Sequence, residues 1–321
     1  MKTTMKKKYL LFAAAALTLA ACSNDENLND GPVELRLSSS LEVQTRANTQ
    51  ATAIAKDEVV SVWVDDAGNG TSLYKAYQLK ADGANGLSGT PMYFPQTGND
   101  VDIYAMHGNF TPAFAIDEDF PTESKTFTVA SDQSEMGTSY TNSDLLYAVK
   151  QDVARTPENV NLTFYHMLSK IEVAVVVGDG APALAADNAI SIGNVITDGT
   201  FKPAKISETE ITDQAARAQM ITAGSTSGNI ILGQETCTDF YGNVVYNEAV
   251  IVPQNMSGKT ISFNLASGGV LKYNIPSTTI FESGKKYRYH ITMRLSDLSV
   301  AAEIVDWDDS PVPEDDFATM D

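Results

Sequence analysis

The residues Asn161-Leu-Thr-Phe-Tyr-His-Met-Leu-Ser-Lys170, followed by Ile171-Glu-Val-Ala-Val-Val-Val177, form the strongest β-strand signal in the chain. The run is rich in β-branched and aromatic side chains and contains neither glycine nor proline. Pro157 precedes it, and the turn Gly178-Asp-Gly180 follows it. Because it lies near the middle of 321 residues, we interpret it as one strand that opens the second of two β-rich domains.

The chain begins with the features of a secretory signal. Three lysines at 6–8 precede an apolar run over residues 9–16, which is too short to span a bilayer permanently. Leu19-Ala-Ala-Cys22 then resembles the bacterial lipobox, in which the cysteine is acylated and becomes the first residue of the mature protein. We therefore expect residues 1–21 to be removed and Cys22 to carry lipid, each buried acyl methylene contributing about 0.8 kcal/mol to anchoring. The alternative is an ordinary signal peptide that happens to contain a cysteine.

The residues after Cys22 suggest a surface location. Residues 22–31 are polar apart from Leu28 and are interpreted as a flexible tether. Their start, Ser23-Asn-Asp-Glu26, is similar to the signal that sends lipoproteins of some Gram-negative bacteria to the outer face of the outer membrane. The expected location is therefore the outer membrane, facing outward.

Acidic residues dominate the composition. The chain has 22 Lys and Arg against 41 Asp and Glu, a formal net charge of −19. The predicted signal peptide contains four of the lysines and no acidic residue, so the mature chain carries 18 − 41 = −23. A surface this acidic repels phosphate, which argues against nucleic acid as a partner. With Cys22 committed to lipid, Cys237 has no cysteine partner in the chain and is interpreted as a free thiol.

A shorter strand is expected at the start of the mature chain. Val33-Glu-Leu-Arg-Leu37 alternates apolar and charged residues, and Leu41-Glu-Val43 continues the register after three serines. The next segment, Gln44-Thr-Arg-Ala-Asn48, is polar. An exposed Arg46–Ala47 bond between two elements is a good protease site.

Further strand patterns, separated by turn residues, fill most of the chain and predict an all-β fold of two sandwich domains. A long irregular segment, 108–142, carries four phenylalanines as core anchors, and a polar segment, 204–228, contains a candidate helical turn at 213–220. In 287–295, alternate residues starting at Tyr287 are expected to face the core and those starting at Arg288 to face water. The expected strands are 59–64, 73–79, 91–95, 101–107, 143–148, 190–195, 229–232, 244–252, 261–265, 270–275 and 287–295.

Several segments together resemble the fimbrillin, or type V pilin, family of surface lipoproteins, including its Mfa-like branch. The resemblance covers most of the chain and is carried by the order and spacing of these segments. They are the lipobox at Cys22, Val101-Asp-Ile-Tyr-Ala105, Ser143-Asp-Leu-Leu-Tyr-Ala148, Phe164-Tyr-His-Met-Leu-Ser-Lys-Ile-Glu-Val173, Val252-Pro-Gln254, Gly284-Lys-Lys-Tyr-Arg-Tyr289 and Trp307.

The resemblance implies two transthyretin-like Greek-key β-sandwich domains and export as a lipoprotein. It also implies that an arginine-specific protease removes an N-terminal strand before subunits polymerise into a pilus. In this chain the family's cut corresponds to Arg46–Ala47, and the removed strand to residues 33–43. The expected organisation is therefore a signal peptide at 1–21, a lipidated propeptide at 22–46, and domains at 47–158 and 159–321.

A strand lost from a sandwich exposes apolar core and unpaired backbone, which favours a replacement strand from another subunit. The candidate donor is the C-terminal run 298–307, in which four residues, Leu298, Val300, Ala302 and Ile304, share a face. The alternative is an ordinary last strand paired within its own domain. Shaft, anchor and tip subunits are not separated by these features, since the acidic tail 308–321 leaves open whether the C-terminus can enter a neighbour.

The competing interpretation is an unpolymerised surface lipoprotein that binds a glycan or a host protein, with Trp63, Trp307 and tyrosines stacking on sugars. No enzyme motif is present. The histidines, His107, His166 and His290, lie in no metal or triad motif, and no cofactor is expected. The acidic loop 65–70 has part of the spacing of a calcium site but is interpreted as a turn.

Overall fold

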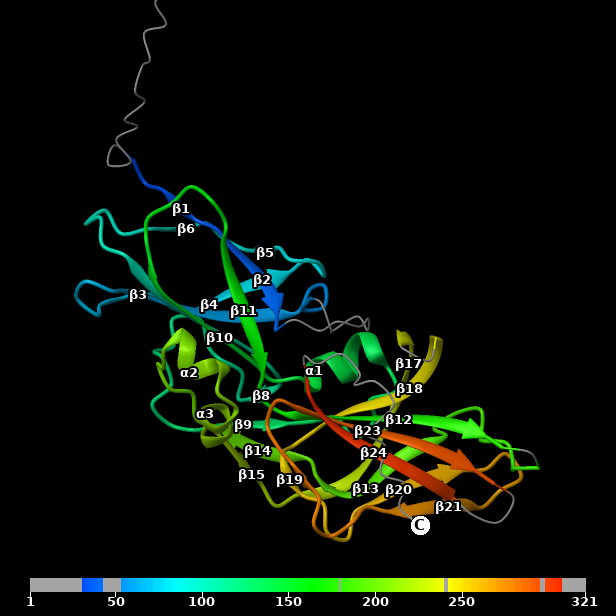
Figure 1. Cartoon of the computed structure of the whole chain (residues 1–321). Helices are drawn as coiled ribbons and strands as arrows, with labels where there is room; N and C mark the ends of the chain where they lie inside the picture. The colour runs from blue at the N-terminus through cyan, green and yellow to red at the C-terminus, as the bar shows by residue number, and fades with distance from the viewer. Residues whose placement is uncertain (1–30, 43–52, 179, 240–241, 295–297, 308–321) are drawn as a thin grey trace, which may run out of the picture. The chain divides into compact units, whose positions relative to one another are not determined.

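β-Strands make up most of the described chain. The computed structural model describes residues 31–42, 53–178, 180–239, 242–294 and 298–307 (Figure 1). Within these ranges the strands form six sheets, and helices are short. The predicted all-β class is therefore confirmed, whereas the division into two transthyretin-like Greek-key sandwiches stays a prediction.

The largest sheet has seven strands and is buried on both faces. In its strand Val101–His107, Val101 and Ile103 belong to one apolar core, while Tyr104 and Met106 belong to another. This follows from the strand period of two, which sends alternate side chains to opposite faces. The order across the sheet is β2 (Leu37–Leu41), β11 (Val160–His166), β10 (Leu146–Val153), β7 (Val101–His107), β3 (Val59–Asp66), β4 (Ser72–Ala81) and β5 (Leu87–Ser88).

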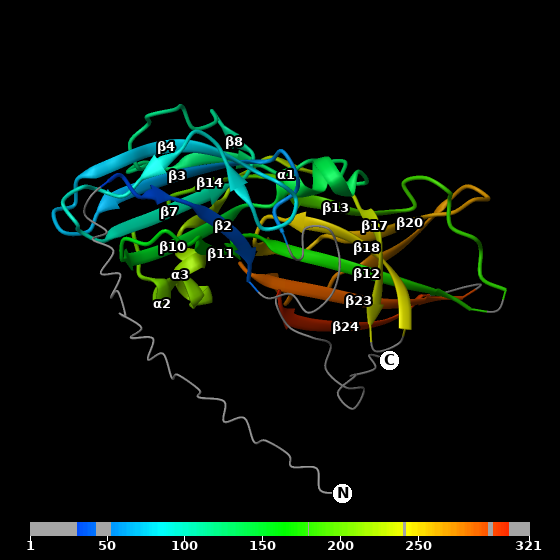
Figure 2. The same ribbon diagram turned by 90° about the horizontal axis from the view of Figure 1, so that it is seen from above.

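A five-stranded sheet carries the C-terminal strand at its edge (Figure 2). Its order is β17 (Gly233–Asp239), β18 (Gly242–Ile251), β12 (Ser169–Val177), β23 (Lys285–Met293) and β24 (Leu298–Asp306). A four-stranded sheet contributes to the apolar core that also contains Tyr104 and Met106. Its order is β16 (Ser227–Ile231), β13 (Ile190–Ile196), β20 (Thr260–Asn264) and β21 (Val270–Asn274).

Three small sheets complete the described strands. The first pairs β1 (Glu34–Leu35) with β6 (Met92–Tyr93), and the second pairs β19 (Gln254–Asn255) with β22 (Ile280–Phe281). The third has the order β15 (Ile221–Ala223), β14 (Asp198–Phe201), β9 (Lys125–Thr128) and β8 (Phe110–Thr111). It joins the predicted irregular segment 108–142 to residues far along the chain. Three of the four predicted phenylalanine anchors in that segment are buried, and Phe120 packs partly buried against the same core.

The helical segments are a π-helical turn (Met136–Tyr140), α1 (Thr141–Ser143), α2 (Glu208–Thr212) and α3 (Gln214–Gln219). The expected helical turn at 213–220 is therefore present, and α2 precedes it. Ser207 caps α2 by accepting a hydrogen bond from the Glu210 backbone N–H, while the Glu210 side chain accepts from the Ser207 N–H. None of the helices in the described ranges is long and apolar enough to cross a membrane.

The interpretation of 161–177 as one strand is wrong, because the chain changes sheets inside it. β11 pairs with β10 and β2, whereas β12 pairs with β18 and β23. Met167 and Leu168 between them are fully buried, and the Met167 N–H donates to the Leu145 carbonyl at 2.9 Å. The predicted boundary between residues 158 and 159 consequently does not coincide with a change of sheet.

The expected core face of β23, which starts at Tyr287, is buried, but the other face is exposed to water only in part: His290 and Thr292 are half-buried, and Arg294 just after the strand is exposed. Arg288 and Lys286 on this other face are buried, and an Arg288 guanidinium nitrogen lies 2.8 Å from a Glu172 carboxylate oxygen on β12. Lys170 lies 3.1 Å from Glu172 and 2.6 Å from Glu248 on β18. Burial disfavours the charge of Glu172, but Lys170, Lys286 and Arg288 hold its pKa at about 2. Neighbouring strands thus supply a compensated buried charge cluster that periodicity alone cannot predict.

Candidate functional site

The N-terminal strand segment is part of the folded core. Leu35, Leu37, Ser39 and Leu41 are buried at alternate positions, while Arg36 between them is exposed. The three leucines belong to the core on one face of the seven-stranded sheet. The alternation expected from the sequence at 33–43 is therefore confirmed for the part that the structure describes.

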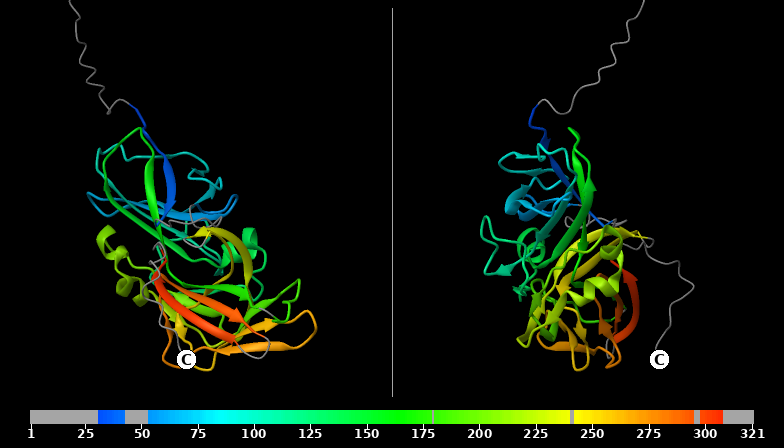
Figure 3. Two further views of the ribbon diagram at one scale, coloured as in Figure 1. Left: turned by 45° about the vertical axis from the view of Figure 1, so that its right-hand side comes forward. Right: turned by 90° about the vertical axis from the view of Figure 1, so that its left-hand side faces the viewer.

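Backbone hydrogen bonds hold this segment on two sides. β2 lies beside β11 (Figure 3, left) and parallel to it. Leu37 is opposite Val160, and Leu41 is opposite Phe164. On its other side the Ser39 N–H donates to the Asn85 carbonyl at 2.8 Å. The segment therefore fills a groove between β11 and the residues just before β5.

The burial of the three leucines is a sizeable stabilising contribution. At about 1.5–3 kcal/mol for each fully buried side chain, the total is roughly 5–9 kcal/mol before the cost of ordering the strand. Loss of the segment would uncover buried neighbours of the same core, such as Leu79 and Leu162, and would leave the edge of β11 unpaired. In the structure the groove holds one extended segment of the chain itself, β2.

A buried ion pair fixes the end of β2. Glu42 accepts a 2.9 Å hydrogen bond from an Arg217 guanidinium N–H, although 175 residues separate the two. The Arg217 side chain is only 6% exposed and lies over the Tyr165 ring, 5.4 Å from its centroid. Because an uncompensated buried guanidinium is costly, the pair ties α3 to the end of the N-terminal strand.

Replacing Glu42 by glutamine is expected to lower the free energy of unfolding of the uncut protein by about 1–3 kcal/mol. The amide can still accept one hydrogen bond but cannot compensate the Arg217 charge. Urea unfolding at pH 7 measures the change. Glu34→Gln is the matched control, because the Glu34–Arg36 pair is largely exposed and is expected to contribute under about 1 kcal/mol. Equal effects of the two substitutions would contradict the role given to Glu42.

The predicted processing residues stay predictions. Cys22, Arg46 and Ala47 lie outside the described residues, as do the signal peptide and the acidic tail 308–321. Glu42 is the last described residue before the predicted cut.

The predicted donor residues lie on β24, the edge strand of the five-stranded sheet. β24 runs antiparallel to β23, with Leu298 opposite Met293, so the ordinary pairing within the same chain is present. Leu298 and Val300 pack partly buried against the core. Ala302 is exposed, and Ile304 is 61% exposed. Two of the four predicted donor residues, Ala302 and Ile304, are therefore not buried when β24 lies in its own sheet.

Trp307 anchors the chain just after β24. Its ring stacks on His166 at the end of β11, with centroids 4.0 Å apart and an interplanar angle of 3°. His166 Nδ1 lies 2.9 Å from an Asp144 carboxylate oxygen, and all three side chains are buried. His166 is thus buried with partners on both its ring face and its Nδ1, as a structural histidine would be, and Trp307 connects the C-terminal strand to the sheet that holds β2.

The acidic loop after β3 is held by protein groups. Asp65 pairs with Lys205 and accepts a 2.8 Å hydrogen bond from the Ser72 hydroxyl. Asp66 accepts from the Asn99 side-chain amide at 2.8 Å. In the described part of the chain, no group of three or more His, Cys, Asp or Glu side chains is arranged to hold a metal ion.

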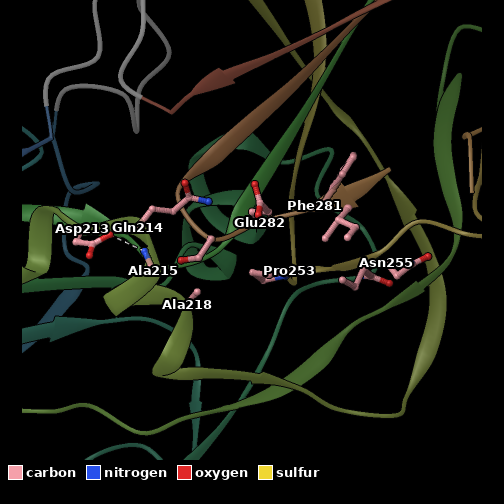
Figure 4. Close-up of a pocket in the computed structure, with 11 residues that line it drawn as sticks. Asp213, Gln214, Ala215, Ala218, Pro253, Asn255, Phe281 and Glu282 are labelled. Atoms are coloured by element: carbon pink, nitrogen blue, oxygen red, sulfur yellow. Dashed lines mark hydrogen bonds between the residues drawn. The ribbon is translucent and has the colours of Figure 1, made fainter. Parts of the chain in front are cut away.

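A separate hollow of about 590 Å³ lies between α3 and the β19–β22 pair (Figure 4). Asp213, Gln214, Asn255 and Glu282 give it polar groups, and Ile280 contributes an exposed apolar side chain. Asp213 already accepts a 2.9 Å hydrogen bond from the Ala215 backbone N–H and caps α3. Both tryptophans, which the alternative interpretation assigned to sugar stacking, are buried elsewhere.

Sequence reasoning missed four residues of this region: Ser39, Glu42, Asp144 and Arg217. Ser39 could have been found from the sequence, because it is a polar residue at an inward position of an alternating strand. For Glu42 and Arg217, and for Asp144 and His166, the contacts form only through tertiary folding.

A family model described as fimbrillin-like matches residues 45–307 of the chain. No curated protein is similar enough in sequence to count as a match.

Solved structures share the fold. One is a putative cell adhesion protein from Bacteroides uniformis, with 21% identity, a TM-score of 0.59, and 87% of this chain and 98% of that chain covered. Another, from Bacteroides ovatus, has 18% identity and a TM-score of 0.58, with 89% and 99% covered. The tip fimbrial protein Mfa3 from Porphyromonas gingivalis, with a C-terminal truncation, has 10% identity and a TM-score of 0.51, with 86% and 100% covered. At these identities the likeness concerns the fold alone.

Proposed function

Because the chain belongs to the fimbrillin-like family, we propose that it is a non-catalytic structural subunit of a cell-surface pilus that supports adhesion. In this account the precursor is exported as a lipoprotein and is anchored to the outer membrane through lipid on Cys22. An arginine-specific protease cuts between Arg46 and Ala47. The processed subunits then polymerise by strand exchange with other pilin subunits.

The observation that carries the proposal is the position of β2. A segment that precedes the predicted cut supplies Leu37 and Leu41 to a core that later segments build. Once the chain is cut after Arg46, no covalent bond holds this segment in its groove. Its departure would expose apolar side chains and an unpaired strand edge, and these favour a new strand.

The candidate replacement is β24 of another subunit. It is an edge strand, so departure from its own sheet breaks backbone pairing on one side only. In a groove like that of β2, Ala302 and Ile304 would become buried. Burial of Ile304 alone would contribute about 1–2 kcal/mol, since it is 61% exposed in its own sheet.

The proposal is tested by cutting the protein from Cys22 to Asp321 with trace trypsin and following its size by light scattering and by unboiled gel electrophoresis. We expect one early cut at Arg46, identified by mass spectrometry, followed by a ladder of oligomers. The Arg46→Ala chain is the control and should stay monomeric. A chain that is cut at Arg46, releases its N-terminal segment and remains monomeric would contradict the proposal.

A second candidate is an anchor or tip subunit, or an unpolymerised lipoprotein, that binds a glycan or host protein. The observation in its favour is the hollow beside α3 in Figure 4, whose wall combines Ile280 with polar side chains. Binding of a ligand by the uncut monomer, lost on Ile280→Asp, would favour this function.

A further inference from the structure

The N-terminal strand is an imperfect occupant of its groove. Ser39 is 1% exposed, yet its Oγ has no hydrogen-bond partner among the described protein groups. The flanking serines face the other side of the strand, where Ser40 Oγ accepts a 2.9 Å hydrogen bond from the Asn161 amide. A buried hydroxyl without a partner destabilises the strand, because it gives up hydrogen bonds to water without replacement. The position that Ser39 occupies in the groove therefore suits a small apolar side chain better than serine.

The C-terminal strand has a small apolar residue at the corresponding place. The inward residues of the N-terminal segment and the predicted donor residues of β24 both follow the order large, large, small, large. The two rows are Leu35, Leu37, Ser39 and Leu41, and Leu298, Val300, Ala302 and Ile304.

Only one alignment of the two rows brings the small residues together and also keeps all four inward positions apolar. With the strands in the same direction, Ala302 takes the place of Ser39 and Ile304 that of Leu41. Reversal of the strand places Val300 at the Ser39 position, and a shift of two residues in the parallel direction places Val300 or Ile304 there. A larger side chain at a position buried to this extent requires its neighbours to move. A reversed strand shifted by two residues does place Ala302 at the Ser39 position, but it puts the charged Asp306 at the buried Leu35 position. The pattern thus selects both the direction and the register of an incoming strand.

We propose that the groove is built for β24 of a second copy of this chain, inserted parallel to β11 with Ala302 at the Ser39 position, and that Ser39 makes the original strand the weaker occupant. This inference rests on the proposed function, since it names the partner and the register of the same groove. Only the original strand carries the unpaired Ser39 hydroxyl. Replacement of this strand by β24 is therefore favoured over the reverse exchange.

The first test measures how tightly the original strand is held. In the trypsin-cut protein, Ser39→Ala is expected to slow release of the N-terminal peptide about fivefold or more, because removal of the orphan hydroxyl stabilises that occupant. Chromatography of the released peptide gives the rate. Ser38→Ala is the control, because Ser38 faces the other side of the strand and should leave the rate within about twofold. Release of the Ser39→Ala peptide at the wild-type rate would overturn this part of the inference.

The second test measures the register. In the proposed alignment Ala301 replaces Ser38, which lies opposite Asn161. In a Cys237→Ser chain, Asn161→Cys combined with Ala301→Cys should give disulfides between copies in the cut polymer, several times more than Asn161→Cys with Ser299→Cys. If the cut wild type polymerises but the cysteine variants link best through position 299, or do not link, the register is overturned while the proposed function stays intact. A cut wild-type chain that stays monomeric would overturn both.

Discussion

Replacing Leu37 by aspartate in the uncut protein is expected to expel the N-terminal strand from its groove. The substitution removes about 1.5–3 kcal/mol of leucine burial and places a carboxylate in an apolar core. The expected loss is at least about 3 kcal/mol, or roughly 100-fold in the population of the open state. Arg36 provides the readout, because its carbonyl accepts a 2.8 Å hydrogen bond from the Val160 N–H while the strand is in place.

An arginine-specific protease should therefore cleave after Arg36 roughly 100-fold faster in the Leu37→Asp chain, since proteolysis follows the open population when reclosing is fast. Arg46→Ala is included in every chain so that cleavage at the predicted processing site does not interfere. Ser38→Asp is the matched control, because it adds the same charge at the adjacent position facing the other side. If both variants are cleaved at the same rate, the N-terminal strand does not depend on its buried leucines.

Replacing Glu172 by glutamine is expected to give the largest loss of global stability, about 3–5 kcal/mol at pH 7, because it leaves buried cations without their shared carboxylate. Lys170 and Arg288 both lie within 3.1 Å of Glu172. Urea unfolding measures the loss. The control is Glu208→Gln, because the Glu208–Lys150 pair is part-exposed and is expected to contribute less than about 1 kcal/mol.

The same carboxyl group predicts a pH dependence. Its pKa is about 2 in the folded protein against a usual value of 4.5, so the unfolded state binds the proton first as pH falls. The stability that Glu172 contributes is therefore fully present above about pH 4.5 and is lost as pH falls towards 2. The difference in unfolding free energy between wild type and Glu172→Gln should shrink over this range. A constant difference from pH 6 to pH 2.5 would contradict the assigned charge state.

Alternation in the sequence predicted the strands that have one uniform environment. The N-terminal strand is the example, because its inward positions recur at every second residue. The strand at 101–107 was predicted from the same alternation, but its second face, with Tyr104 and Met106, is buried in another core. Alternation did not show where 161–177 changes sheets. Neither glycine nor proline marks the break at Met167 and Leu168, and the break is set by hydrogen-bond partners elsewhere, such as Leu145 and Gly284.

The candidate site was predictable in part for the same reason. The N-terminal strand and the apolar row of β24 are local patterns. The contact of Glu42 with Arg217 spans 175 residues, and no local pattern encodes it. Arg288 was expected in water because it alternates with apolar residues, but the neighbouring strand β12 provides Glu172, and Arg288 is buried. Compensation of buried charges is a property of the assembled sheet.

Hydrogen–deuterium exchange of β11 tests the central claim most directly, because β11 forms one wall of the groove in every state. The measurement compares the uncut protein, the cut protein just after release of its N-terminal peptide, and the polymer. We predict slow exchange at Val160–Phe164 in the uncut protein, fast exchange after release, and slow exchange again in the polymer. If exchange stays slow after release, or stays fast in the polymer, the groove is not emptied and refilled, and the strand-exchange account is wrong.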